Sequence, residues 1–131
     1  MSRGPKAKTI ALEDRTFIFA RRVREFAKGL PVEVAPAELV KKLLRSSGAV
    51  DSSCVEANEA LCKEDYFMRL KLARNEANKT DNCLKGLDLS NFKKLDKWRR
   101  PFLTEAEELS RIFTSVLEEG DNEPWPPIED I

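Results

Sequence analysis

The stretch KEDYFMRLKLARNEANKTDNCLKGL, residues 63–87, decides the fold of this chain. Its small and apolar side chains recur at alternating steps of four and three residues, the heptad spacing at which one face of an α-helix stays buried along its length. The members of this seam are Tyr66, Leu70, Ala73, Ala77, Thr80, Leu84 and Leu87. A seam of this kind is typical of antiparallel bundles. We therefore predict a long helix over residues 63–87 that packs along one face.

Two amphipathic segments precede this helix. In residues 13–29 the apolar positions Phe19, Val23 and Phe26 recur at steps of four and three, and Gly29 with the proline that follows Leu30 ends the pattern. After a loop bounded by two prolines, residues 37–61 repeat the spacing for more than twenty residues. The middle of that segment is small, with two serines, a glycine and an alanine over 46–49, which lets a neighbouring helix approach closely.

The last helix is predicted over residues 104–119. Thr104 and Glu107 have the spacing of a capping box, and Gly120 closes the segment. Pro101 marks a break before it, so we interpret 88–103 as a connector with a short helical turn. The predicted chain has a flexible basic N-terminus over 1–11, an all-α, antiparallel up-down-up-down four-helix bundle over 12–119, and an acidic, proline-rich tail over 120–131.

Composition excludes several classes of protein. The chain has 131 residues with 23 basic and 23 acidic side chains, a length suited to one domain. Residues 1–45 carry eleven basic and five acidic side chains, whereas residues 46–131 carry twelve and eighteen. No apolar run reaches the ~20 residues of a membrane span. The N-terminus has no apolar core after its basic residues, so we expect no signal peptide and a cytoplasmic protein with no membrane partner.

The residue types argue against catalysis. The sequence has no histidine, which removes the usual general base and most catalytic zinc sites. The three cysteines, Cys54, Cys62 and Cys83, have no paired spacing, and we interpret them as small buried hydrophobes. Glu56 and Glu59 form a carboxylate pair one helical turn apart, but no second motif faces it to complete a metal site. We expect no enzyme activity, no cofactor and no metal.

Two basic patches are candidates for nucleic-acid binding. One lies on the polar face of residues 13–29, and the other surrounds a tryptophan in residues 90–100. The candidate residues are Arg15, Arg21, Arg22, Arg24, Lys28, Lys93, Lys94, Lys97, Trp98, Arg99 and Arg100. Cations bind phosphates while a base stacks on an aromatic ring. The alternative is that each patch is an ordinary solvated helix face.

Three further groups of residues remain as candidates. A structural polar network is predicted for Arg45, Glu56, Lys71 and Glu76, with a polar site in the bundle or a water-filled central channel of the oligomer as the alternative. Met68 and Leu72 lie off the buried seam and are candidates for an oligomer interface. Trp125 and Ile128 in the tail are candidates for docking a partner, with a simple solubilising tail as the alternative.

Three stretches of the chain resemble a known family. They are LEDRTFIFARRVREFAKGLP (12–31), LLRSSGAV (43–50) and VEANEALCKEDYFMRLKLARNEANKT (55–80). They are similar to the bacterial four-helix bundle proteins first noticed in intervening sequences of large-subunit ribosomal RNA genes. The resemblance covers about residues 12–119. The chain departs from the family pattern at Asp51, Ser52 and Ser53, where a Gly-Ala-Asn step is usual, and at Cys83, where an aromatic residue is common.

The resemblance implies assembly more than activity. Family members form cyclic homopentamers, and a related branch, the accessory variability determinant of diversity-generating retroelements, binds nucleic acid and a reverse transcriptase. We therefore expect a non-enzymatic, ring-forming oligomer that binds RNA or DNA through its basic surface, with a nucleic-acid enzyme as a candidate partner. The alternative is a structural adaptor that docks proteins through its tail or ring surface and does not bind nucleic acid.

Overall fold

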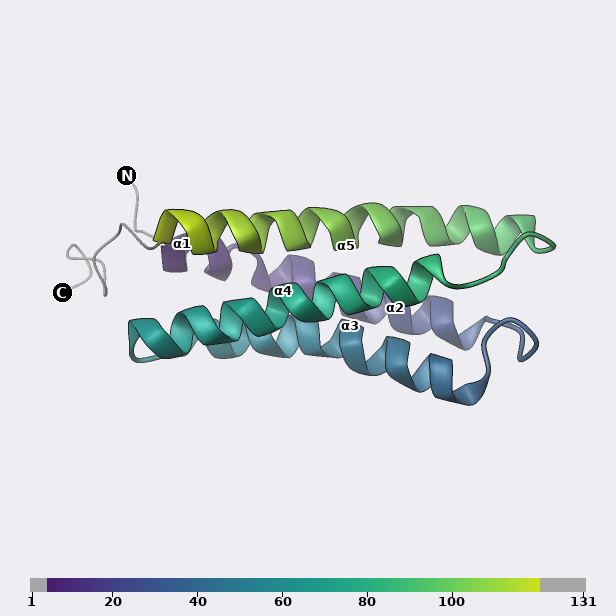
Figure 1. Ribbon diagram of the computed structural model, residues 1–131, viewed down its shortest axis with the longest axis horizontal. Helices are drawn as coiled ribbons and strands as arrows, with labels where there is room; N and C mark the ends of the chain where they lie inside the picture. The colour runs from purple at the N-terminus through teal and green to yellow at the C-terminus, as the bar shows by residue number, and fades with distance from the viewer. Residues whose placement is uncertain (1–4, 121–131) are drawn as a thin grey trace.

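The protein, described here by a computed structural model for residues 5–120, is built only from helices over that range. They are α1 (Pro5–Ile10), α2 (Glu13–Lys28), α3 (Ala37–Asn58), α4 (Lys63–Lys85) and α5 (Lys93–Gly120). The four long helices, α2 to α5, run up and down the molecule in turn, and α1 lies at the end where α5 stops (Figure 1). The predicted all-α antiparallel four-helix bundle is confirmed. None of these helices is both long and apolar enough to cross a membrane.

The heptad seam of α4 forms the centre of the core. All seven of its predicted members are buried, but α4 ends at Lys85, two residues before the predicted end, so Leu87 lies in the connection that follows. They pack against apolar side chains from the other helices, including Phe26 of α2, Leu43 of α3 and Phe113 of α5. Burying a large apolar side chain contributes about 1.5–3 kcal/mol. The periodicity of one helix thus determines how the other three surround it.

The small residues of α3 allow it to pack closely on α4. Ser46 and Ser47 are buried, and their hydroxyls donate to the carbonyl oxygen of Leu43 within the same helix. The hydroxyl of Thr80 donates across the interface to the Ser46 Oγ at 2.9 Å. A buried hydroxyl that finds a partner avoids the cost of desolvation. The buried Ser46 and Ser47 therefore serve packing as predicted, whereas at Gly48 no atom of another helix lies within 4 Å of the place that a Cβ would occupy.

The predicted connector over 88–103 is wrong. Helix α5 begins at Lys93 and continues through Pro101, and Thr104, expected to cap a new helix, is an interior residue whose hydroxyl donates to the Arg100 carbonyl. Proline inside a helix costs roughly 3 kcal/mol or more. Packing offsets that cost, because the rings of Trp98 and Phe102, which flank the proline, both contact the Phe26 ring of α2.

The expectation of a flexible N-terminal arm is wrong for residues 5–11. Helix α1 folds back onto the bundle, and Thr9 is fully buried. The Thr9 and Tyr66 hydroxyls are hydrogen bonded at 2.9 Å, and the Asn58 amide donates to the Thr9 carbonyl at 3.0 Å. The polar atoms of one threonine thus fasten α1 to both α3 and α4.

The turn between α3 and α4 begins earlier than predicted. Helix α3 ends at Asn58 instead of continuing to residue 61, and Leu61, the last residue of the predicted helix, is 96% exposed. Cys62 is exposed in the same turn, which corrects the interpretation of all three cysteines as buried; Cys54 and Cys83 are buried.

Candidate nucleic-acid interface

The two ends of the bundle differ in charge. At one end the α2–α3 and α4–α5 connections meet, and the residues there, 24–45 and 79–100, include twelve basic and six acidic side chains. At the other end, residues 7–16, 51–70 and 106–120 include five basic and eleven acidic side chains. These regions, named here the basic end and the acidic end, lie at the right and left of Figure 1. The near-neutral bundle is therefore polar along its long axis.

Exposed cations gather on the first two turns of α5. Lys93, Lys94, Lys97 and Arg100 are all exposed. Three of them, Lys93, Lys97 and Arg100, line a hollow of about 470 Å³ between α5 and the connection that precedes it, together with Leu89, Ser90 and Asp96. Among the described residues no carboxylate lies within 4.0 Å of the three lysine ammonium groups. The three lysines therefore remain available to an anionic partner, whereas the Arg100 guanidinium pairs with Asp96 at 3.1 Å.

Trp98 lies beside this cluster with its ring partly accessible. The indole packs edge-on against the Phe26 ring, with ring centroids 5.3 Å apart and planes at 86°, and it also covers Gly29. These contacts fix the ring, yet the residue is 43% exposed. An aromatic ring held in this way loses little entropy when a second ring stacks on it. Trp98 thus offers a partly exposed aromatic surface on the same two turns of α5 as the cations.

Arg99 was predicted to bind nucleic acid, but it holds the protein together. Its guanidinium donates to the carbonyl oxygens of Leu84 at 2.9 Å and Leu87 at 2.7 Å, and it pairs with Asp96. The hydrogen bonds from Arg99 hold the pKa of the Asp96 carboxyl below its usual value. Arg99 therefore caps the C-terminal end of α4 from α5.

Arg15 is also a structural residue. Its guanidinium bonds to Glu105 at 2.7 and 2.8 Å and lies 3.0 Å from Glu108, so it bridges α2 and α5. The hydrogen bond to Glu105 raises the pKa of Arg15. A bidentate arginine–carboxylate pair is geometrically specific. Arg15 and Arg99 are thus occupied within the protein.

The other four predicted cations of α2 are exposed. They are Arg21, Arg22, Arg24 and Lys28. Arg22 lines a hollow of about 260 Å³ between α2 and α5, together with Pro101 and Phe102. Lys28 directly precedes Gly29, which Trp98 covers. The structure thus places Arg22 against the middle of α5, at Pro101 and Phe102.

A second cationic hollow was not predicted from the sequence. It lies between α3 and α4, has a volume of about 570 Å³, and includes Ser46 in its lining. Its charged lining residues are Glu38, Lys41, Lys42, Arg45, Glu76 and Lys79. Three of the cations, Lys41, Lys42 and Arg45, lie within five residues of α3, and the register of the two helices brings Lys79 of α4 to them. The Ser46–Thr80 and Glu56–Arg69 contacts show that register. An antiparallel alignment of the two predicted helices would have placed these charged residues together and so predicted the hollow.

The predicted polar network does not form as one unit. Glu56 pairs with Arg69 at 3.2 Å rather than with Arg45. Arg45 and Glu76 do line the same α3–α4 hollow, but the Glu76 carboxylate lies 3.2 Å from the Lys79 ammonium. Lys71 lies on another face and lines a hollow between α4 and α5. The prediction was wrong because spacing along one helix does not show which face the neighbouring helix covers.

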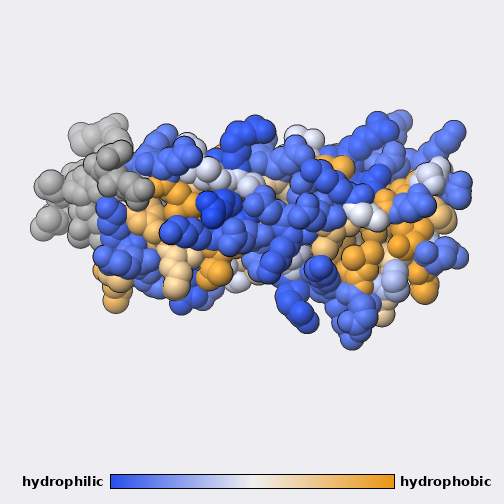
Figure 2. Space-filling view, viewed as in Figure 1, coloured by the Kyte–Doolittle hydropathy of each residue, from blue (hydrophilic) through white to orange (hydrophobic). Residues whose placement is uncertain are grey.

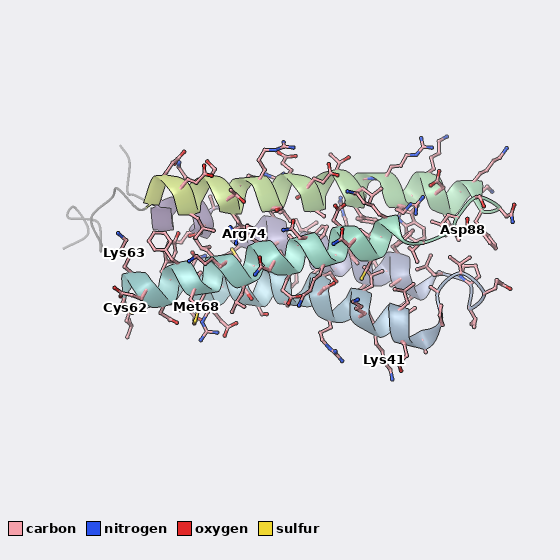
Figure 3. The ribbon with its side chains drawn as sticks, in the orientation of Figure 1. Lys41, Cys62, Lys63, Met68, Arg74 and Asp88 are labelled. Carbon is pink, nitrogen blue, oxygen red and sulfur yellow. The ribbon has the colours of Figure 1, made fainter. Side chains whose placement is uncertain are left out.

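Apolar side chains are exposed outside the basic end. Met68 and Leu72 occupy successive turns of α4 and are 48% and 42% exposed. Met68 projects from the edge of the bundle in Figure 3. The face seen in Figure 2 is mostly hydrophilic, with separate apolar groups towards each end. Trp125 and Ile128 of the tail lie outside the described residues.

The thiols and carboxylates of the bundle form no evident reactive centre within residues 5–120. Burial raises the pKa of the Cys54 thiol to about 12, which keeps it protonated at neutral pH. Burial also raises the pKa of the Cys83 thiol, although the nearby charge of Lys42 opposes the shift. Over the same range no group of three or more potential ligands could hold a metal ion.

Comparison with known proteins adds support for the fold. No protein-family model matches the chain, and no curated protein matches it. Among solved structures, the chain is similar to a protein of unknown function from the S23 ribosomal protein family of Bacteroides thetaiotaomicron VPI-5482. The match has a TM-score of 0.69 and 22% sequence identity, and it covers 85% of this chain and 98% of that one. At this identity the likeness shows a shared helical fold alone.

Proposed function

We propose that this protein is a non-catalytic helical bundle that binds the phosphate backbone of RNA or DNA at its basic end. One observation carries the proposal: four exposed cations and a partly exposed Trp98, held by its contact with Phe26, lie on the first two turns of α5. Each cation that contacts a phosphate releases a condensed counterion, so affinity depends steeply on salt. Unpaired bases can also stack on the indole, which favours single strands.

Self-association would multiply this surface. We propose that copies of the chain form a closed homo-oligomer, with five subunits as the resemblance implies, through an interface that includes Met68 and Leu72. The exposure of these two side chains on successive turns of α4 supports the interface. A closed ring repeats each basic end once per subunit, and linked sites can raise the overall affinity by about 10²–10⁴-fold.

The test is fluorescence anisotropy with labelled single-stranded RNA, duplex RNA and duplex DNA over a salt series. We expect log-linear loss of affinity with salt and the tightest binding to the single strand. Replacing Lys94 and Lys97 by alanine should weaken binding about tenfold or more. The salt slope should fall by about one for each phosphate that the variant no longer binds.

A charge-matched double variant controls for net charge. Lys71→Ala with Arg111→Ala also removes two exposed cations, but away from the basic end. We expect this variant to bind nearly as well as the unmodified chain. Equal losses of affinity in the two double variants, or no binding at low salt by the folded protein, would contradict the proposal.

The second candidate function is a protein adaptor that does not bind nucleic acid. The exposed pair Met68 and Leu72 favours it, because an exposed apolar face on a small bundle marks an interaction site. Replacing both residues by serine distinguishes the two functions. If the variant no longer self-associates but each subunit still binds RNA, the protein is a nucleic-acid binder that oligomerises. If the unmodified chain binds no RNA but captures a protein partner independently of salt, the protein is an adaptor.

A further inference from the structure

The α3–α4 hollow has more positive charge than its own carboxylates neutralise. Of its two carboxylates, Glu76 pairs with Lys79 at 3.2 Å, and Glu38 lies 3.9 Å from Lys41. Within residues 5–120, no carboxylate lies within 4.0 Å of Lys42 or Arg45. The wall of this hollow thus presents an ammonium and a guanidinium group to solvent, a pair suited to a doubly charged phosphate.

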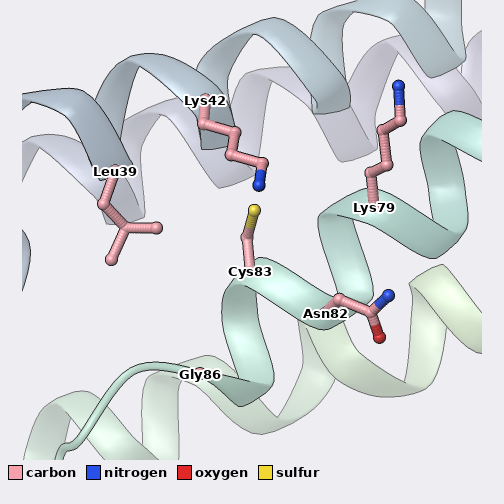
Figure 4. A pocket seen from close by; sticks show the side chains of 6 residues that line it. All are labelled: Leu39, Lys42, Lys79, Asn82, Cys83 and Gly86. Atoms are coloured by element: carbon pink, nitrogen blue, oxygen red, sulfur yellow. The ribbon is translucent and has the colours of Figure 1, made fainter.

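A smaller hollow of different character continues from the first. It has a volume of about 250 Å³ and shares Lys42 and Lys79 with its larger neighbour. Its remaining lining residues are Leu39, Asn82, Cys83 and Gly86. Figure 4 shows the Lys42 ammonium above the Cys83 sulfur, with the Leu39 side chain projecting on the same side. Two partly apolar side chains, an amide and a glycine therefore adjoin the cationic wall.

We infer that the joined hollows bind a nucleoside phosphate, with its phosphates at Lys42 and Arg45 and its base beside Leu39, Cys83 and Asn82. The larger hollow alone, at about 570 Å³, lies within the range of about 300–1,000 Å³ that is common for sites of small organic ligands. The Cys83 thiol stays protonated because burial raises its pKa, so it adds no negative charge beside the phosphates. The exposed Asn82 amide can donate to and accept from a base edge. This inference goes beyond polynucleotide binding by α5 and uses none of its cations.

The same chemistry could come from a free nucleotide or from the phosphorylated 5′ end of a strand. Isothermal titration calorimetry of the full chain with ADP, inorganic phosphate and a short RNA with and without a 5′ phosphate separates these sources. We expect ADP to bind with one site per chain and more tightly than phosphate. An RNA that gains affinity from its 5′ phosphate, where ADP alone does not bind, assigns the site to strand ends.

The decisive variants are surface substitutions that preserve the fold. Lys42→Ala and Arg45→Ala remove exposed cations, and each should weaken ADP binding roughly tenfold or more. Asn82→Ala should weaken ADP binding but leave the binding of inorganic phosphate unchanged. Lys71→Ala is the matched control on another face of α4 and should change neither.

Two results would overturn the inference. One is the absence of binding by ADP, phosphate and 5′-phosphorylated RNA to the folded chain. The other is unchanged binding in the Lys42→Ala, Arg45→Ala double variant, confirmed as folded by circular dichroism. If inorganic phosphate binds as tightly as ADP, the base does not contribute to binding and the site recognises phosphate alone. Because the α5 variants leave Lys42 and Arg45 intact, failure here is distinguishable from failure of the proposed polynucleotide surface.

Discussion

The acidic end and the start of α5 at the basic end use polar side chains differently. At the acidic end, the Thr9–Tyr66 and Lys8–Glu119 contacts bind α1 to the bundle, and Arg69 bridges α4 to Glu56 of α3. At the basic end, the lysines at the start of α5 have no such partner among the described residues. Polar groups that are satisfied internally contribute to folding, whereas unpaired surface cations contribute little to it. The difference separates side chains that hold the fold from side chains available to a ligand.

The largest expected effect is on stability, in the core. Phe113→Ala removes a fully buried ring of α5 and should cost about 3–5 kcal/mol in the free energy of unfolding. Urea denaturation followed by circular dichroism measures it. RNA affinity, corrected for the folded fraction, should not change. A loss of affinity in the folded variant would mean that the residues that stabilise the fold also contribute to RNA binding.

Arg99 tests this difference between the two ends, because it lies at the basic end but has a structural role. Arg99→Ala removes its bonds to Leu84, Leu87 and Asp96 and should cost about 1.5–3 kcal/mol of stability. Lysine should not rescue it, since an ammonium lacks the planar fork. The neighbouring Arg100→Ala should instead weaken RNA binding with a stability change within about 0.5 kcal/mol. If the two phenotypes were exchanged, the assignment of structural and binding arginines would be wrong.

The anchor of α1 should have a smaller effect. Tyr66→Phe deletes the hydroxyl that meets Thr9 and should cost about 1 kcal/mol. A double-mutant cycle with Thr9→Val measures the coupling of the two hydroxyls by urea unfolding. The cycle should give a favourable coupling energy, whereas additive costs would show that the two groups act independently.

Acidification should have the smallest effect, through the contact between Arg99 and Asp96. Hydrogen bonding to Arg99 lowers the pKa of Asp96 from its usual 3.8. A lowered folded-state pKa gives stability that is present above pH 3.8 and lost as pH falls through the folded value. The stability difference between the unmodified chain and Asp96→Asn should therefore shrink below about pH 4. A difference that stays constant from neutral pH to about pH 3 would show that ionised Asp96 does not contribute.

The sequence predicted the presence of the helices better than it predicted their boundaries and the contacts between them. The seam through Leu70 and Ala77 repeats locally, so it specified both a helix and its buried face. Pro101 predicts a helix break because the energetic cost of a proline inside a helix depends only on local sequence. The contact that compensates for this cost joins Trp98 to Phe26, 72 positions earlier in the chain, so the sequence pattern does not reveal it. The prediction for the N-terminal segment was wrong for a related reason: the partner of Thr9, Tyr66, is distant in sequence.

The candidate site was predictable only in part. The exposed lysines of α5 could be found because they cluster within five residues beside an aromatic ring. Arg15 and Arg99 look the same in sequence, and only the placement of Glu105 and the α4 carbonyls shows that they are occupied. The α3–α4 hollow needed the register of two helices, which a pattern along one helix does not contain.

Lysine footprinting tests the central claim most directly, because lysines lie both at the basic end and elsewhere on the bundle. The full chain would be lightly acetylated with and without single-stranded RNA at low salt, and each lysine quantified by mass spectrometry. The account predicts that RNA protects Lys93, Lys94 and Lys97 while Lys63 and Lys71 react as before. Equal protection of all lysines, or protection confined to Lys63 and Lys71, would contradict it.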